Sequence, residues 1–249
     1  MLEAKNLNFT YPGSNQKRLQ DLSFTLPDQA KLGILGLNGC GKTTLLKVLA
    51  GLLKPTSGQV FWQQKDLESH SAIERAKFMA YLPQDFPLAY PFTVKQLVLM
   101  GRYPHRQGFF DSAKDFEMAH QALQKFGIED LAERSILTLS GGQRQKAILA
   151  RTWVQEAKWI LFDEPFHHLD IKAQMELSDF MAGLDQGWIA VLHDLCLAEK
   201  LCDHLLLIKD GQLVAFGDTK TVLNNETLSQ TFGMPVERFS YSAAPVANP

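Results

Sequence analysis

The sequence predicts an α/β fold with a mainly helical block inserted into it, and three observations lead to this prediction. Short apolar runs bounded by turn residues recur along the chain, which is typical of buried strands. Segments with apolar residues at helical spacing follow several of these runs. The alternation stops near residue 86 and resumes near residue 159, so both ends of the helical block are expected to return to the same sheet.

The first part of the chain is predicted to form strands around one helix. A turn at Pro12–Asn15 separates the first two strands, and Pro83 stops the last one. A helix is predicted over Thr43–Gly51. The strands are expected at 2–11, 22–26, 31–35, 60–62 and 78–82. Four leucines of the helical segment are expected to face the core: Leu45, Leu46, Leu49 and Leu52.

From about Phe86 to Ala157 the pattern is helical and includes no convincing strand. The helices are expected at 94–100, 112–126 and 142–157. In the last of these, one face collects Ala147, Ala150, Val154 and Ala157 at helical intervals.

Alternation then resumes through the last part of the chain. The segments expected to alternate are 159–162, 171–184, 188–192, 195–201, 205–208 and 213–216. The tail Ser240–Pro249 is small, polar and proline-containing, and we expect it to be disordered.

Composition places the chain among soluble globular proteins. Its 249 residues, 45% hydrophobic and 21% charged, suffice for one large α/β domain or two small ones. The net charge of −2 argues against nucleic-acid binding, which usually needs a basic face, and gives no polybasic membrane anchor. The sequence shows neither the roughly 20 apolar residues of a membrane-spanning helix nor a secretory signal. We therefore expect a cytosolic chain that reaches a membrane only through a partner.

The strongest local signal is the glycine-rich segment Gly36-Leu-Asn-Gly-Cys-Gly-Lys-Thr-Thr44. It follows a predicted strand and opens a predicted helix, which is the setting that a phosphate-binding loop requires. Its glycines let backbone N–H groups point at phosphate oxygens, and the helix N-terminus adds its positive dipole end. Lys42 can reach the β- and γ-phosphates, and Thr43 can offer its hydroxyl to Mg²⁺. A chance match arises in on the order of one in a hundred chains of this length, so nucleotide binding is favoured over a simple turn.

The three cysteines are Cys40, Cys196 and Cys202. They lack zinc-finger spacing and leave an odd one over, so we expect reduced thiols in a reducing compartment. Cys40 lies in the glycine-rich segment at a helix N-terminus, which should lower its pKa and make it the reactive thiol.

A second signal is the apolar run Trp159–Phe162 followed by two acids, Asp163 and Glu164. A strand end of this kind can place Asp163 on Mg²⁺, and Glu164 could then polarise an attacking water as a general base. Alone, such a pair is usually a strand end at the surface. Downstream of a phosphate-binding loop, it is better interpreted as a metal-and-base pair.

The third signal is Leu139-Ser-Gly-Gly-Gln143. Ser140 before two glycines predicts a helix N-cap whose free N–H groups could meet a phosphate. Without the other motifs, a simple cap would be the better interpretation.

The order of these pieces resembles the ATP-binding-cassette family: phosphate loop, glutamine loop, LSGGQ signature, acidic strand end and switch histidine. The resemblance runs from Leu2 to about Arg238, and the correctly placed LSGGQ makes it highly specific. It implies a P-loop NTPase core, with a mostly parallel sheet and an N-terminal antiparallel β part, plus an inserted α-helical subdomain. The implied ATPase domain covers residues 1–238, with the helical subdomain at about 86–157 and a disordered tail at 239–249.

Four further residues match the family pattern. Tyr11 matches the aromatic residue that stacks on adenine, although alone it would be a core aromatic. Gln84 matches the glutamine that senses Mg²⁺ and the γ-phosphate. His193 matches the switch histidine, and Asp170 belongs to the loop that crosses to a partner subunit. The resemblance implies catalytic roles for Glu164, His193, Gln84 and Lys42, and metal contacts for Thr43, Gln84 and Asp163. It implies that nucleotide also contacts Gly36, Asn38, Gly39, Cys40, Gly41, Thr44, Ser140, Gly141, Gly142 and Gln143.

The chain departs from the family pattern in a few places. Leu37 and Cys40 replace common proline and serine or alanine. Phe166-His167 replaces a small or polar pair, which leaves the packing of the partner-facing loop open, and Trp153 is bulkier than the usual alanine. His167, His168 and His193 are of a residue type that binds metals, but neighbouring side chains rarely converge on one ion, so we do not predict a zinc site.

Three short sequence segments resemble those of the ATP-binding subunits of metal-chelate importers for siderophores, haem or cobalamin. The segments are Met100–His105, Glu164–Ile171 and the His193-Asp-Leu195 run followed by Leu201–Asp203. The resemblance implies ATP and Mg²⁺ as cofactors, a second copy in a head-to-tail dimer, and a permease that holds the chain at the cytoplasmic membrane face. A substrate-binding protein would act indirectly. Alternatives are a soluble cassette ATPase, for example in iron–sulfur assembly, an exporter subunit, or a cassette that binds nucleotide without hydrolysing it.

Overall fold

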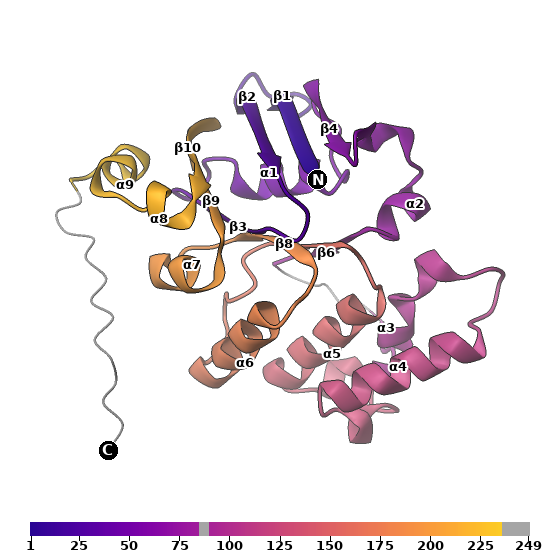
Figure 1. Ribbon diagram of the computed structural model, residues 1–249. Helices are drawn as coiled ribbons and strands as arrows, with labels where there is room; N and C mark the ends of the chain where they lie inside the picture. Colours follow the sequence, from indigo (N-terminus) through magenta and orange to yellow (C-terminus); the bar gives the residue numbers. More distant parts are fainter. Residues whose placement is uncertain (85–89, 236–249) are drawn as a thin grey trace, which may run out of the picture.

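The computed structural model describes residues 1–84 and 90–235, and the α/β fold class is confirmed in layers of two sheets and surrounding helices (Figure 1). The predicted start of the helical block at Phe86 and the predicted disordered tail at 239–249 lie outside the described residues. Within the described ranges, no helix combines the length and the apolar character needed to cross a bilayer.

The smaller sheet is the antiparallel part and has the strand order β2-β1-β4-β5. In β2, Leu22, Phe24 and Leu26 are buried and alternate with exposed residues, so one face of this strand packs on the core and the other meets water. The strands are β1 (Leu2–Thr10), β2 (Lys17–Leu26), β4 (Ser57–Trp62) and β5 (Lys65–Asp66).

The larger sheet has the order β10-β9-β3-β8-β7-β6 and is parallel except for β10. Its strands β7 and β8 are buried at every position, as expected where both faces of a parallel sheet are covered. The strands are β3 (Lys31–Leu35), β6 (Met79–Leu82), β7 (Trp159–Phe162), β8 (Gly187–Val191), β9 (His204–Lys209) and β10 (Gln212–Asp218).

Two apolar cores lie on the two faces of this parallel sheet. The sheet-side core, which includes Leu161 and Ile189, joins it to α1 and the antiparallel sheet. The helix-side core, which includes Phe162 and Trp188, joins it to the helices on the opposite face. Consecutive strand residues therefore serve different cores, which is the two-residue period of a strand.

The helices are arranged around this frame as Figure 1 shows, with α1 on the side of the antiparallel sheet and α5, α6 and α7 on the other side of the parallel sheet. Leu52 was predicted to face the core, but α1 ends at Leu49 and the Leu52 side chain is 57% exposed. The α-helices are α1 (Lys42–Leu49), α2 (Ala72–Ala76), α3 (Val94–Met100), α4 (Ala113–Lys125), α5 (Gly141–Val154), α6 (Ile171–Ala182), α7 (Leu195–Leu201), α8 (Thr219–Val222) and α9 (Asn225–Phe232). The 3₁₀ turns are η1 (Leu67–Ser69), η2 (Tyr103–His105), η3 (Glu129–Leu131) and η4 (Ile136–Thr138).

Helices α3, α4 and α5 form the helical block between β6 and β7, and each begins at a capping box. Thr93, Ser112 and Ser140 are the respective N-caps, and each accepts a hydrogen bond from a backbone N–H three residues further on. The side chain at that third position returns a hydrogen bond to the N-cap backbone. Two otherwise unpaired donors are satisfied in this way, which fixes where each helix starts.

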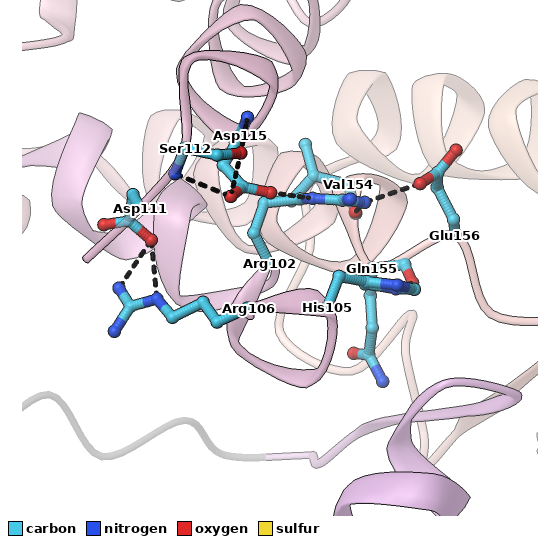
Figure 2. A network of polar contacts seen from close by, with 9 residues as sticks. All are labelled: Arg102, His105, Arg106, Asp111, Ser112, Asp115, Val154, Gln155 and Glu156. Carbon is cyan, nitrogen blue, oxygen red and sulfur yellow. Dashed lines mark hydrogen bonds and ion pairs between the residues drawn. The ribbon is translucent and has the colours of Figure 1, made fainter. Parts of the chain in front are cut away.

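A buried arginine joins the three helices of this block (Figure 2). Arg102 is 2% exposed; its Nε donates to Asp115 at 2.9 Å, and its Nη1 donates to the Val154 carbonyl and to Glu156, both at 2.6 Å. Burial disfavours the ionised form of Asp115, but hydrogen bonds from Ser112 and Arg102 outweigh it and hold the pKa of Asp115 at about 2. Each charge in this network has a partner, so removing one partner would leave a buried charge unpaired and destabilise the block.

The C-terminal end of α5 is also attached to the parallel sheet. The Gln155 side chain donates to the backbone carbonyls of Ala76 and Met79, at 2.8 and 3.0 Å. The His105 ring donates to the Gln155 carbonyl at 2.8 Å (Figure 2). These hydrogen bonds therefore attach the end of α5 to the start of β6, next to the network around Arg102, in addition to the helix-side core.

Two unusual aromatic residues pack within this framework. Trp153 of α5 is half-buried against the helix-side core, and the Lys125 ammonium of α4 lies 5.7 Å from its ring centroid. Phe166 packs against the same core from the loop after β7. The bulk of both residues thus contributes to packing, which the sequence pattern alone left open.

Candidate functional site

A pocket of about 650 Å³ lies where four neighbouring parallel strands end. The strands β3, β8, β7 and β6 lead at their carboxyl ends into the glycine-rich loop, His193, Glu164 and Gln84, respectively. Ligands of open α/β sheets bind at this edge. The lining residues are Tyr11, Arg18, Asn38, Gly39, Gly41, Lys42, Thr43, Thr44, Gln84, Glu164, His167 and His193.

The glycine-rich loop between β3 and α1 requires glycine at two positions. A Cβ atom at Gly36 would lie 2.2 Å from the Ile208 carbonyl oxygen, and one at Gly41 would lie 2.5 Å from the Arg18 carbonyl oxygen. Gly41 also has φ of 114° and precedes the first residue of α1. A side chain at either position would push the loop away from β2 and β9, so these glycines set where its N–H groups lie.

Lys42 is folded back over this loop. It is 5% exposed, and its ammonium donates to the carbonyls of Gly36 and Leu37 at 2.9 and 3.0 Å. An ammonium has three protons, so one donor remains for a ligand in the pocket. The geometry fits the phosphate contact predicted for this lysine.

Asp163 is held by hydroxyl groups on both of its oxygens. Thr43 donates to Oδ1 and Tyr81 donates to Oδ2, each at 2.8 Å, and Asp163 is only 3% exposed. Burial, and then the hydrogen bond to Asp163, raise the pKa of the Tyr81 hydroxyl above its usual value, so Tyr81 stays a donor. Thr43 and Asp163 are far apart in sequence, and the structure brings them into direct contact; their predicted metal contacts stay a prediction.

Glu164, Gln84 and His193 meet at the opposite side of the pocket. The Nε2 of His193 lies 2.9 Å from Oε1 of Glu164, and the Gln84 amide donates to Oε2 at 3.1 Å. Glu164 has φ of 49°, a left-handed conformation that is uncommon outside glycine. The backbone turn at this residue directs the carboxylate toward Gln84 and His193, and strain of this kind is frequent at functional sites.

Tyr11 lines the pocket beside the start of α1. Its hydroxyl lies 3.2 Å from Oγ1 of Thr44, and its ring packs edge-on against Phe9 with centroids 4.8 Å apart. The residue is 37% exposed, so it is not the buried core aromatic that was the alternative interpretation. A partly exposed ring whose position is fixed by these two contacts is suited to stacking.

We expect Tyr11→Ala to weaken ATP binding by about 1–3 kcal/mol, the usual contribution of a base–aromatic stack. Tyr11→Phe should lose only the contact with Thr44 and change affinity by less than ~1.5 kcal/mol. Titration with ATP and with tripolyphosphate distinguishes lost stacking on adenine from general damage to the pocket. Equal losses for both ligands would contradict adenine stacking, because tripolyphosphate has no base.

The signature residues lie elsewhere. Ser140 and Gln143 form the capping box of α5, with Ser140 Oγ accepting from the Gln143 N–H. Gly142 and Gln143 line a second pocket of about 310 Å³ together with Asp170, which is the N-cap of α6. In the described part of the chain, no residue of the signature lines the larger pocket. The structure therefore does not bring the signature to the phosphate loop of the same chain.

The signature glycines are not required by the fold of this chain. No heavy atom lies within 4 Å of a Cβ built at Gly141 or Gly142. Neither residue has a positive φ. The space above this backbone is open, as needed when another molecule approaches the N–H groups at a helix N-terminus.

The predicted reactivity of Cys40 is wrong. The residue is 5% exposed, and burial raises the pKa of its thiol despite the opposing effect of the nearby Lys42 charge. The sulfur lies under the loop, where it would be 2.8 Å from a Cβ at Gly36. Desolvation of the thiolate thus outweighs the helix N-terminus, and Cys40 supports the loop as a packed side chain.

Cys196 is the exposed cysteine of the three, and we expect a maleimide to modify it first. Cys40 and Cys202 are both buried with raised thiol pKa values, so their reaction should be at least ~10-fold slower. Mass spectrometry of peptides after brief labelling measures the order. Faster labelling of Cys40 would contradict the burial argument, and a Cys196→Ser variant serves as the matched control.

Three residues in or next to the pocket were not assigned a function from the sequence: Arg18 and His167 line it, and Tyr81 contacts Asp163 beside it. Arg18 of β2 donates to the Gly39 carbonyl at 3.2 Å, and no motif marks it. Tyr81 lies three residues before Gln84, but its contact with Asp163 is visible only in three dimensions. His167 was given no role from the sequence, yet it lines the pocket and contacts Gln84 at 3.3 Å. Its position directly after Glu164-Pro-Phe was the available signal.

Comparison with known proteins agrees with these motifs. Residues 19–167 match the family model described as ABC transporter. The petrobactin import ATP-binding protein FpuD of Bacillus anthracis is 37% identical over 238 residues, which are 94% of this chain and 86% of that protein. The cobalamin import ATP-binding protein BtuD of Halobacterium salinarum is 35% identical over 218 residues. That alignment covers 86% of this chain but only 54% of the halobacterial protein, so the chain spans about half of its length.

A solved structure of similar fold is an inward-facing conformation of a metal-chelate type ABC transporter. It superposes with a TM-score of 0.80 at 31% identity and covers 94% of this chain and 89% of that chain.

Proposed function

Because the chain belongs to the ATP-binding-cassette transporter family, we propose that it is the ATP-binding and ATP-hydrolysing subunit of an importer. The observation that carries the proposal is the pocket itself. A phosphate loop, a buried aspartate, and a glutamate paired with a histidine meet at the ends of four adjacent parallel strands. The proposed ATPase domain comprises residues 1–238, with the helical subdomain at about 86–157.

The triphosphate of ATP binds along the glycine-rich loop. Backbone N–H groups at the start of α1 and the ammonium of Lys42 supply positive charge to the phosphate oxygens. Asn38, Gly39, Gly41 and Thr44 complete the lining of this part of the pocket. Tyr11 stacks on adenine at its edge.

The donor set next to this loop fits Mg²⁺. Thr43 offers a hydroxyl, Asp163 a carboxylate and Gln84 an amide oxygen, and magnesium prefers oxygen ligands. Asp163 is already positioned by two hydroxyl donors. When bound, Mg²⁺ would neutralise charge on the β- and γ-phosphates.

Hydrolysis depends on Glu164. Its carboxylate is held between the His193 ring and the Gln84 amide, which leaves it fixed at the pocket wall with its side chain 17% exposed. A carboxylate in this position can take a proton from an attacking water as general base. His193 orients this carboxylate and, as the family pattern implies, contacts the γ-phosphate.

Two copies of the chain complete the site. The open backbone at Gly141 and Gly142 and the separation of Ser140 from the phosphate loop support a head-to-tail pair. Each ATP then lies between the loop of one chain and residues Ser140–Gln143 of the other, with Asp170 at the seam. ATP stabilises this dimer by mass action, and loss of the γ-phosphate contacts lets it open.

The permease binds a different surface. A groove of about 360 Å³ runs between the end of α1, α2, η2 and the end of α5. Leu52 and Tyr103 on its walls are 57% and 58% exposed, which fits an apolar helix laid into a groove. This contact holds the chain at the cytoplasmic face of the membrane, and a substrate-binding protein acts through the permease. Nucleic acid is not a partner.

The cargo is a metal chelate of siderophore, haem or cobalamin type. The proposal rests on the relatives named for petrobactin and cobalamin import and on the metal-chelate type transporter of similar fold. It is tested by reconstituting the chain with its permease in liposomes and measuring ATP-driven uptake of a ferric siderophore, haem and cobalamin. Uptake of one cargo is the expected result. ATP-driven export, or ATPase activity without association with a permease, would contradict it.

A further inference from the structure

His167 lines the pocket proposed for catalysis and lies next to Gln84. Its backbone N–H donates to the Glu164 carbonyl at 3.1 Å, which closes a turn immediately after the glutamate. Phe166 packs into the helix-side core, so the anchored Phe166 holds this turn against the sheet. The next side chain, His167, lines the pocket, and its ring lies 3.7 Å from that of His168, centroid to centroid.

The Gln84 amide nitrogen has two partners in this pocket. Nε2 of Gln84 lies 3.1 Å from Oε2 of Glu164 and 3.3 Å from Nδ1 of His167. A carboxylate only accepts hydrogen bonds, and an amide nitrogen only donates them. The two N–H bonds of Gln84 are therefore directed at Glu164 and His167, and Nδ1 of His167 must be the acceptor.

This arrangement determines which way the amide of Gln84 points. With both N–H bonds directed at acceptors, the Oε1 oxygen is turned away from Glu164 and His167. With Glu164 as the sole acceptor, the amide could rotate about that single hydrogen bond. The second acceptor removes this freedom, because a planar group held at two points has one orientation.

We infer that His167 is a positioning residue that fixes the side-chain amide of Gln84, with its nitrogen toward Glu164 and its oxygen directed away from it. The inference rests on the proposed function, because it acts through Gln84 and Glu164. The family pattern has a small or polar residue where this chain has His167, so the device is a property of this chain. The expected effect on turnover is that of one hydrogen bond, a factor of ~2–10 in kcat.

The test compares His167→Leu with His167→Asn. Leucine keeps the bulk and removes the acceptor, and asparagine can place its Oδ1 close to where Nδ1 lies. We expect His167→Leu to lower kcat ~2–10-fold with KM for ATP nearly unchanged, because the phosphate loop and Tyr11 are untouched. His167→Asn should restore most of the loss. Equal losses in both variants, or a change confined to KM, would overturn the inference.

A double-mutant cycle separates this inference from the proposed function. In a Gln84→Ala background, His167→Leu should have no further effect on kcat, since the amide that it positions is gone. If Gln84→Ala hydrolyses ATP slowly and His167→Leu lowers kcat further in that background, the inference is overturned and the proposed function is unaffected. Normal turnover of Gln84→Ala contradicts the proposed role of Gln84 itself.

A second readout does not depend on activity. In the nucleotide-free protein at about pH 8, where imidazoles are generally neutral, ¹⁵N NMR of labelled histidine reports which ring nitrogen carries the proton. We expect the His167 proton on Nε2, with Nδ1 as acceptor, and a shift of the Gln84 side-chain amide signal in His167→Leu. A proton on Nδ1 would overturn the inference.

Discussion

Replacing Glu164 with glutamine is expected to slow ATP hydrolysis by ~10²–10⁴-fold, the usual effect of removing a general base. The side chain keeps its size, and the contacts of Lys42 and the glycine-rich loop are unchanged, so ATP affinity should remain close to that of the wild-type chain. An amide cannot take the proton of the attacking water at neutral pH. Because bound ATP persists, two copies should remain associated, and size-exclusion chromatography should show an ATP-dependent dimer.

Single-turnover hydrolysis with labelled ATP measures the chemical step directly. The matched control is Glu117→Gln, which makes the same chemical change on the exposed surface of α4, where Glu117 accepts from Gln121. This control should hydrolyse ATP at the wild-type rate. Near-normal hydrolysis by the Glu164→Gln variant would assign the base to another residue.

Lys42→Ala and Gly141→Asp should each abolish activity for different reasons. The first removes the buried ammonium that reaches the phosphates, together with its bonds to Gly36 and Leu37. The second places a carboxylate where the γ-phosphate of the partner's ATP would lie, and like charges repel strongly once water is excluded. Gly141→Asp should still fold, since nothing lies within 4 Å of its Cβ position and an acid is favourable in the first turn of a helix.

Mixing these two inactive proteins should restore one competent site in each mixed dimer. One of the two sites then contains both substitutions, and the other contains an unchanged Lys42 and an unchanged Gly141. Single-turnover hydrolysis or ATP-dependent heterodimer formation is the suitable measurement, because steady-state turnover can require both sites.

The matched negative control mixes Lys42→Ala with Glu164→Gln. Both lesions then lie on the same half of the shared site, so the mixed dimer contains one damaged phosphate loop and one missing base and has no intact site. Because Glu164→Gln is itself expected to form ATP-dependent dimers, this control is read by single-turnover hydrolysis. Recovered hydrolysis in this control as well, or no recovery with Gly141→Asp when both proteins are folded, would contradict a site shared between chains.

Sequence patterns located several elements to the residue because clear local signals bound them. The predicted and observed ranges coincide for 31–35, 94–100, 159–162 and 195–201. The short elements β5, α2 and α8 were not predicted, because so few residues cannot display a period. Leu52 was misplaced because apolar spacing continued beyond the point where α1 ends.

The candidate site could be predicted where a motif names the residue and its neighbours in sequence. The contacts of Tyr81 with Asp163 and of His167 with Gln84 join segments about 80 residues apart, so they depend on the order of strands in the sheet. For Cys40, a prediction from local sequence was wrong because of three-dimensional packing. A local rule about helix N-termini predicted a reactive thiol, and the packing of the loop against β9 overrode it by excluding water.

Helix α5 carries the signature at its first turn and is attached to the sheet at its other end, through Gln155 and next to the network around Arg102. At 1.5 Å per residue, its span from Gly141 to Val154 is about 21 Å. The signature thus lies at one end of α5, and the attachment to the start of β6, close to the groove proposed for the permease, lies at the other. Since α5 packs against α3 and α4 in the helix-side core, the three helices are expected to move together. A rotation of these helices by about 5° about this attachment would move Ser140 by about 2 Å, which is enough to make or break a hydrogen bond. In the proposed dimer, a small displacement at the groove would therefore produce a larger displacement of the signature next to the partner's nucleotide.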